Sequence, residues 1–323
     1  MPRVPHGPFA SAFAEYRLFE VHDLPYGAPS PTSRRMHASV NAELVRDSLG
    51  RHGLVSTLIL ESTQSTIVRR ARSAHPSLDL PMGSALSVTG TLRNEEGVYV
   101  GLQSRTDDGT LLRCFADVFR SLVPRSTLPV PMSGLELFGE LTSDLAAASK
   151  LLIRCTHRVR TESERSADDV ARSYRESFST GRVVLDQRCT GTLSLSLRAD
   201  LVTRSAPPSG RSAYGSAIGM EADWRLTPFL RMRVRSTIHS TDGYAAAIPV
   251  AEVAASGSMR LVMLYDDGAR TTCSLEAAPM NGVRVWVRVE MTEKNSTASM
   301  GSSLTETQGP RQRTVFLQTE VRL

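Results

Sequence analysis

The sequence predicts an all-β fold, an antiparallel up-and-down transmembrane β-barrel of about 14 strands, within a range of about 12–16. Three observations support this prediction. Apolar residues recur at every second position along most of the chain, which is the period of a strand. Short and long connections alternate between the strands, and several strands carry charges at mid-strand on their polar face. A sheet with one apolar and one charged face follows from this pattern.

The alternation is clearest in six segments. In 192–204, for example, Leu195 and Leu197 fall on one face, whereas Arg198 and Asp200 fall on the other. In chain order, the six segments are 36–46, 192–204, 216–226, 229–239, 283–292 and 313–323. Weaker strand candidates lie at about 54–61, 84–93, 97–104, 111–120, 134–142, 150–160, 182–190 and 268–278, with 12–20 as a further candidate. The few helical patterns lie at 143–152 and 166–177.

The connections between these strands alternate in length. The short turns fall at 190–191, 227–228 and 279–282. The long polar stretches fall at 161–181, 205–215, 240–267 and 293–312. Outer-membrane barrels have short periplasmic turns and long external loops, and strands of about 9–11 residues suit a tilted crossing of the hydrocarbon layer. We therefore expect the long stretches outside and the short turns in the periplasm. This order holds for every connection after about residue 120, whereas 62–83 would be a long segment on the inner side.

Charges gather on the polar faces of neighbouring strands. Arg231, Arg233 and Arg235 follow one another on one strand, and the preceding strand carries Glu221 and Asp223. A wide polar lumen accommodates such a ladder while the opposite face meets lipid. The predicted lumen-facing residues are Arg198, Asp200, Glu221, Asp223, Arg225, Arg231, Arg233, Arg235, Arg284, Arg288 and Glu290. A soluble sandwich with a solvated polar face is the alternative, and the 6% of aromatic residues leaves little for interfacial girdles.

The N-terminal region carries no visible export signal. The predicted organisation is a poorly defined segment at 1–35, a candidate for truncation, followed by the β-barrel at 36–323. The longest apolar run, 244–251, contains Pro249 and is shorter than the roughly 20 residues of a membrane helix. The first residues also lack the apolar centre of a secretory signal. A location in the outer membrane therefore implies a signal peptide encoded upstream of Met1.

The basic residues are almost all arginines. The chain of 323 residues has a formal net charge of +5, and of its 38 basic residues only Lys150 and Lys294 are lysines. Codon bias in a GC-rich genome is one explanation; the other is that the rigid guanidinium fork serves side-chain ladders or anionic partners. The arginines are spread over the strands instead of clustering with aromatic residues, so we expect this region to bind no nucleic acid.

Motifs for catalysis and metal binding are missing from the sequence. The 4 cysteines form no CxxC pair and the 7 histidines form no HExxH motif. The sequence also lacks a GxSxG elbow, an SxxK box, a P-loop and a GxGxxG after a strand. Adjacent carboxylates such as Asp107 and Asp108 suit turns better than acid–base catalysis. We expect the chain to be no enzyme and to hold no metal and no cofactor.

Four stretches from about residue 110 onward follow the order of a known family. The stretch 111–141 resembles a strand, a proline-bearing loop and a Pro-x-Ser-Gly re-entry, and 224–244 resembles a hairpin with a proline turn. LYDDGAR (264–270) stands where the family has Leu-Tyr-Gly-x-Gly-x-Arg, and 301–309 resembles a Gly-Ser-Gly-Leu box before the final strand. The chain thus resembles the C-terminal outer-membrane β-barrel of Gram-negative envelope proteins that begin with a helix-hairpin-helix segment.

The chain departs from this family at three places. The loop after Tyr244 is alanine-rich where the family is aromatic, Leu323 replaces a terminal aromatic residue, and 1–110 contains no helix-hairpin-helix element. The resemblance implies that outer-membrane lipid surrounds the barrel. It also implies that the barrel-assembly machinery reads the C-terminal strand 313–323.

Together, these observations predict a non-enzymatic outer-membrane β-barrel with a polar, arginine-rich lumen, acting as a porin-like channel or an envelope scaffold. If the lumen is open, the row Arg231, Arg233 and Arg235 is expected to favour anions. The alternative is a soluble exported β-sandwich or β-rich binding module without a pore.

Overall fold

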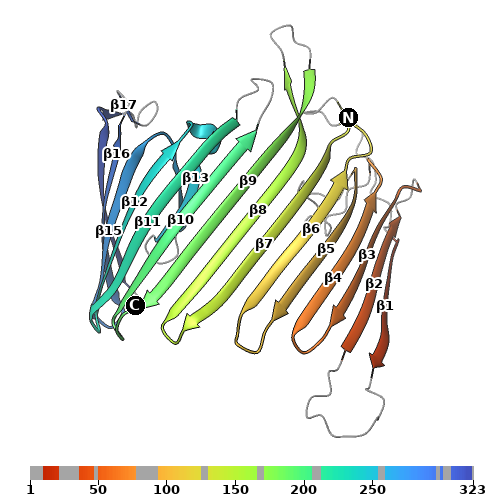
Figure 1. The fold of residues 1–323 in the computed structure, drawn as a ribbon, viewed down its shortest axis with the longest axis horizontal. Coiled ribbons are helices and arrows are strands. Elements are labelled where there is room, and N and C mark those ends of the chain that lie inside the picture. The colour runs from red at the N-terminus through yellow and green to blue at the C-terminus, as the bar shows by residue number, and fades with distance from the viewer. Residues whose placement is uncertain are drawn as a thin grey trace, which may run out of the picture. The chain divides into compact units, whose positions relative to one another are not determined.

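The computed structural model consists almost entirely of antiparallel strands (Figure 1). It describes residues 10–21, 36–46, 50–77, 94–124, 130–165, 171–205, 212–253, 259–295, 299–300 and 307–321. The main ladder has fifteen strands and follows chain order, except that β15 follows β12 and β19 follows β16. The fold class predicted from the sequence, an all-β antiparallel up-and-down sheet within the expected range of strand number, is confirmed. Among the described residues, no helix has the length and apolar character needed to span a membrane.

The strands are longer than average and begin and end as follows. The first nine are β1 (Ala10–Val21), β2 (Met36–Arg46), β3 (His52–Glu61), β4 (Ser65–Ala74), β5 (Glu95–Arg105), β6 (Leu111–Arg120), β7 (Ser133–Ala146), β8 (Ser149–Arg165) and β9 (Ala171–Arg188). The next elements are β10 (Leu193–Ser205), β11 (Ser212–Thr227), β12 (Leu230–Thr241), the 3-10 turn η2 (Tyr244–Ala246), β13 (Ile248–Val253) and β14 (Met259–Leu264). The last are β15 (Gly268–Met280), β16 (Val283–Lys294), β17 (Ser299–Met300), β18 (Thr307–Gln308) and β19 (Arg311–Val321).

The chain divides into two compact units. Unit 1 comprises residues 1–140 and 156–177, and unit 2 comprises residues 141–155 and 178–323. Unit 1 contains the ladder from β1 to β6, and unit 2 contains the ladder from β10 to β19 together with two small hairpins, β13–β14 and β17–β18. The predicted division at residue 35 stays a prediction; β1, which lies before it, pairs antiparallel with β2.

A strand that the sequence did not predict restores the alternation of connections. β4 (Ser65–Ala74) lies inside the segment 62–83, for which the sequence predicts a long connection on the inner side. With β4 in place, a short connection at 62–64 precedes a long one at 75–94. From there to the end of the ladder, every second connection is longer than those that flank it, although 166–170 and 206–211 span only five and six residues. The turns predicted at 190–191, 227–228 and 279–282 are found at 189–192, 228–229 and 281–282.

Three further predictions about local structure were wrong or fall outside the described residues. Residues 143–152 form no helical turn, because they belong to β7, a two-residue turn and β8. Most of 161–181, predicted as a loop with a helical part, extends β8 and β9. The strand candidate at 84–93 lies outside the described residues, as does 166–170.

The short connections are closed by local hydrogen bonds. In the turn after β5, the Thr106 hydroxyl donates to the Asp108 carboxylate, and the backbone amide of Thr110 donates to the same carboxylate at 3.1 Å. The bond from Thr106 is the main cause that lowers the pKa of the Asp108 carboxyl below its ordinary value. The adjacent pair Asp107 and Asp108 thus forms a turn.

The apolar face of the sheet is more exposed than the charged face, which is the reverse of the order in a soluble protein. In unit 2, Ile218 on β11, Ile238 on β12 and Leu317 on β19 are about 70% exposed. On the opposite face of the same sheet, Asp200 and Glu290 are only 6% and 3% exposed. Unit 1 shows the same order, because apolar side chains such as those of Val118 and Leu44 are exposed whereas Arg72 and Glu95 are buried. In both units, these charged side chains are thus less exposed than the apolar side chains on the opposite face.

Candidate functional site

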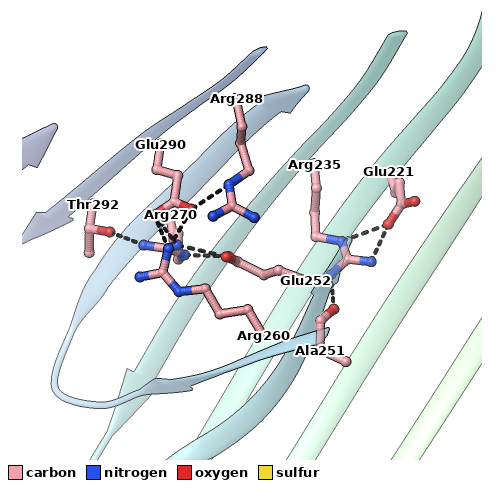
Figure 2. Close-up of polar contacts among 9 residues, drawn as sticks. All are labelled: Glu221, Arg235, Ala251, Glu252, Arg260, Arg270, Arg288, Glu290 and Thr292. Atoms are coloured by element: carbon pink, nitrogen blue, oxygen red, sulfur yellow. Dashed lines mark hydrogen bonds and ion pairs between the residues drawn. The ribbon is translucent and has the colours of Figure 1, made fainter. Parts of the chain in front are cut away.

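The hairpin β13–β14 covers part of the charged face of unit 2 (Figure 2). This hairpin and η2 form the connection between β12 and β15, for which the sequence predicts a long polar loop at 240–267. The two short strands pair in register, with Ile248 opposite Leu264 and Glu252 opposite Arg260. The connection is thus an ordered element of the site.

The base of the hairpin packs on the sheet through an apolar cluster. Ile248, Val250 and Leu264 from the hairpin are buried together with Val202 of β10 and Ala217 of β11. The alternation of β13 places Ile248 and Val250 on one side, so both can turn toward the sheet. Gly215 of β11 allows the close approach, because a Cβ at this position would collide with the carbonyl oxygen of Ala246.

Arg270 of β15 is the central anchor of the hairpin. Its guanidinium group is 10% exposed and donates to both carboxylate oxygens of Glu252 on β13, at 2.5 and 2.8 Å. It also donates to Glu290 of β16 at 2.9 Å and to the Thr292 hydroxyl at 2.6 Å. Because the Glu252 and Glu290 side chains are almost fully buried, their charges depend on this partner.

Two more guanidinium groups pair with the Glu290 carboxylate. Arg260 of β14 donates to both of its carboxylate oxygens, at 2.7 and 2.9 Å. Arg288, two residues away on β16, forms an ion pair with it at 2.8 Å. The Phe316 ring of β19 lies beneath both arginines, with its centroid 4.5 Å from the Arg288 guanidinium carbon and 5.4 Å from that of Arg260. Figure 2 shows these guanidinium groups converging on one carboxylate.

Arginines of the sheet also bind the backbone of the hairpin. Arg235 of β12 pairs with Glu221 of β11 and donates from Nη1 to the carbonyl oxygen of Ala251 at 2.6 Å. Arg198 of β10 pairs with Asp200 and donates to the carbonyl oxygen of Pro249 at 3.1 Å. These bonds give two backbone carbonyl groups of the hairpin a guanidinium donor from the sheet. The hairpin is therefore held by side chains from β10, β12, β15 and β16.

The return of the connection to β15 is fixed by a lysine. Lys294 of β16 is buried, forms an ion pair with Asp266 at 3.0 Å, and lies 3.1 Å from the centroid of the Tyr265 ring. The edge of the same ring packs against Tyr244, with centroids 5.6 Å apart. Both ends of the connection are thus tied together.

The remaining arginines of the row are balanced within the sheet. Arg231 and Arg233 of β12 both donate to Asp223 of β11, at 2.6 and 2.9 Å. Three arginines of β12, with Arg235, therefore share two carboxylates, Asp223 and Glu221. The excess positive charge of the row is smaller than its sequence indicates.

Strand register places the predicted residues on one face. Arg225 stands opposite Arg231, Arg231 opposite Glu276, and Arg284 opposite Glu320. By the same alternation, all predicted residues share the face that the hairpin covers in part; they are Arg198, Asp200, Glu221, Asp223, Arg225, Arg231, Arg233, Arg235, Arg284, Arg288 and Glu290. Sequence reasoning missed Glu252, Arg260 and Arg270, which complete the anchor. Whether this face lines a lumen stays a prediction at this point.

Unit 1 carries a separate buried ion-paired cluster. Arg72 of β4 donates to Glu95 of β5 at 2.7 Å and makes two parallel bonds to Asp117 of β6, at 2.9 and 3.0 Å. The Glu95 side chain is fully buried. All three residues belong to adjacent strands of one sheet, so this cluster joins neighbouring strands of the wall.

No family model matches the chain, and no curated protein matches it. Among solved structures, the chain is similar to the NanC porin, at 7% identity and a TM-score of 0.35, over 71% of this chain and 94% of that chain. It is similar to a loop-deletion mutant of OmpT, an outer membrane protein of Vibrio cholerae, at 9% identity and a TM-score of 0.37, over 97% of both chains. It is also similar to BamA from Haemophilus ducreyi, at 10% identity and a TM-score of 0.34, over 88% of this chain and 57% of that chain. The resemblance to the helix-hairpin-helix family stays a prediction.

Proposed function

We propose that the chain is a non-enzymatic, porin-like outer-membrane β-barrel. In this proposal the sheet closes with its charged face inward, and the hairpin β13–β14 narrows the lumen. The observation that carries the proposal is the reversed exposure of the two faces. Apolar side chains such as Ile218, Ile238 and Leu317 stand exposed, which is unfavourable in water and favourable in lipid.

The position of the hairpin argues against the soluble alternative. A β-sandwich buries the apolar face of its sheet beneath a second layer. In unit 2 the hairpin is a second layer, but it lies on the charged face and is held there by Arg270 and Arg235. A polar lumen accounts for both facts, since each arginine facing hydrocarbon near the midplane would cost roughly 2–4 kcal/mol.

The topology proposed from the sequence also accords with the connections. The short connections, such as 228–229 and 281–282, would be periplasmic, and the long ones, such as 242–267 and 295–310, would be external. The hairpin would then fold into the lumen from the external side. Outer-membrane lipid would surround the barrel, and the barrel-assembly machinery would recognise the strand at 313–323.

Heat-modifiability tests the barrel directly. Protein extracted from outer membranes in detergent should migrate faster on a gel before boiling than after, and should give a β-type circular dichroism spectrum only in micelles. A monomer that is soluble and folded without detergent would contradict the proposal.

Planar-bilayer recordings test the role of the hairpin in the same preparation. Replacing residues 248–264 with a short glycine–serine linker should raise the single-channel conductance, because the linker leaves the charged face uncovered. A matched control is an equal shortening of the connection at 295–310. If neither protein conducts while both remain heat-modifiable, the barrel is an envelope scaffold and not a channel.

A further inference from the structure

Unit 1 has a pocket on the same face as its buried arginine cluster. The pocket has a volume of about 310 Å³, which is within the usual range for small-molecule sites of roughly 300–1,000 Å³. The side chains that matter for its chemistry are Thr66, Tyr99, Gln103, Arg113, Phe115 and Phe138. They come from four strands, β4 to β7, so the rigid sheet fixes their positions.

Three aromatic rings form one wall of the pocket. The centroids of Tyr99 and Phe115 are 5.4 Å apart and the two rings are tilted by 33°, while those of Phe115 and Phe138 are 5.1 Å apart and nearly parallel. Gly101 stands opposite Phe115 in the register, and a Cβ there would lie only 2.6 Å from the Tyr99 hydroxyl oxygen. The missing side chain lets the Tyr99 ring lie across the strand and extend the aromatic surface.

These rings do not simply fill space in a core. Phe119, on the same face, is 2% exposed and packs onto Gly134. Tyr99, Phe115 and Phe138 are instead only half-buried and line a cavity. Aromatic surface that remains open on a polar face is a site where an apolar ligand face can pack.

The rim of the pocket both donates and accepts hydrogen bonds without a net charge. Arg113, half-exposed, donates to Gln103 at 3.2 Å and to the buried carboxylate of Glu140 at 3.3 Å. Guanidinium, amide and Thr66 hydroxyl groups can donate, whereas the Gln103 carbonyl and the hydroxyl can accept. Because Glu140 balances Arg113, the rim has no strong preference for an ion.

We propose that this pocket binds the ring of a neutral sugar. A pyranose has C–H groups on its faces, which pack against the electron-rich faces of aromatic rings. It also has a rim of hydroxyls, each of which donates and accepts, in the same arrangement as the rim of the pocket. The inference rests on the proposed function only in placing the pocket inside the lumen; the binding itself requires no open pore.

Saturation-transfer NMR on the folded protein in micelles tests this inference without depending on conduction. The probes are glucose and maltose, with cyclohexanol as a ring that lacks the hydroxyl rim and glucuronate as an anionic sugar. We expect saturable binding of glucose or maltose. The variants Phe115→Ala and Phe138→Ala should each weaken it by about tenfold, the upper end for loss of one aromatic contact.

Matched variants distinguish a loss of sugar binding in the pocket from a loss of barrel folding. Val100→Ala removes an apolar side chain from the opposite, exposed face of β5 and should leave sugar binding unchanged. Phe115→Leu keeps most of the volume but removes the ring, so it should weaken binding as Phe115→Ala does. Heat-modifiability, measured on every variant, reports folding separately. The inference is overturned if neither sugar binds, if cyclohexanol or glucuronate binds more tightly than glucose, or if both phenylalanine variants bind sugar as the wild type does.

Discussion

Units 1 and 2 use the same chemistry on their charged faces for different purposes. In unit 1, Arg72 lies between Glu95 and Asp117 on adjacent strands, so the cluster joins strands of the wall. In unit 2, Arg270 also lies between two buried carboxylates, but Glu252 belongs to the inserted hairpin. A buried arginine with two acidic partners therefore stabilises a sheet in one case and attaches a separate segment to it in the other.

The largest effect is expected from breaking the cluster within the wall. Arg72→Met removes the guanidinium group that pairs with the fully buried Glu95 carboxylate and with Asp117, which should lower the free energy of unfolding by about 3–5 kcal/mol. Urea titration in micelles, followed by circular dichroism, measures this change. The double variant Arg72→Met, Glu95→Gln should recover part of the loss, because it also removes the buried negative charge that Arg72 balances. Equal stability of Arg72→Met and the wild type would contradict the wall role.

Breaking the anchor of the hairpin should lower the free energy of unfolding by less than Arg72→Met does, and the structural change should stay local to the hairpin. In Arg270→Met, the hairpin can move away from the sheet and water can reach Glu252 and Glu290, so we expect a loss of only about 1–3 kcal/mol. Trypsin should then cleave after Arg260, which is paired with Glu290 in the intact site. Mass spectrometry of the fragments measures this cleavage. If Arg270→Met destabilises as much as Arg72→Met without exposing Arg260, the two clusters have the same role.

A smaller loss of stability is expected from a substitution that disturbs the close backbone contact beneath the hairpin. Gly215→Ala places a methyl group against the carbonyl oxygen of Ala246, so the turn must shift, at a cost of about 1 kcal/mol. Gly191→Ala is the matched control, because nothing lies within 4 Å of a Cβ there. Thermal unfolding of both variants in micelles compares them. Equal melting temperatures would show that the turn at 244–246 does not need this close approach.

The smallest effect on stability per substituted side chain is expected from the arginine row itself. Cross-strand pairs of opposite charge contribute about 0.2–1 kcal/mol each, and the three arginines share only two carboxylates. The variant Arg231→Gln, Arg233→Gln, Arg235→Gln should therefore stay folded. If the pore is open, its weak preference for anions should change to one for cations, because Asp223 and Glu221 lose their partners. Reversal potentials across a salt gradient measure this, and unchanged selectivity would remove the row from the conduction path.

Strands with a simple alternation could be predicted from the sequence, and the others could not. β10, β11 and β12 were predicted nearly to their ends, because their apolar and charged residues separate cleanly by face. β4 was missed because Arg69, Arg70 and Arg72 place arginines on both of its faces. Arg69 stands between Leu58 and Val100 on the exposed face, which conceals the period of two.

The hairpin could be predicted even less, because its contacts are distant in sequence. Apolar residues fall at alternate positions in the segment 248–253, but it is short and contains Pro249. The sequence therefore predicts a loop there. Its position depends on Arg270 and Arg198, and no local pattern connects these residues to Glu252 or to a backbone carbonyl. The predicted row of arginines was therefore placed correctly on one face, while the element bound by Arg235 was not foreseen.

The order in which the anchors of the hairpin occur along the chain has a consequence for assembly. Arg198 and Arg235 precede the hairpin, whereas Arg270 and Glu290 follow it. As long as β15 and β16 are not in place, the hairpin is held only by the bonds to its neutral backbone carbonyls and by the small apolar cluster, and Glu252 lacks Arg270. The charged contacts become complete only when β15 and β16 join the ladder, because these strands supply Arg270 and Glu290. The hairpin should thus remain mobile until β15 and β16 have joined the ladder, and the pairing of these strands would then fix it in place.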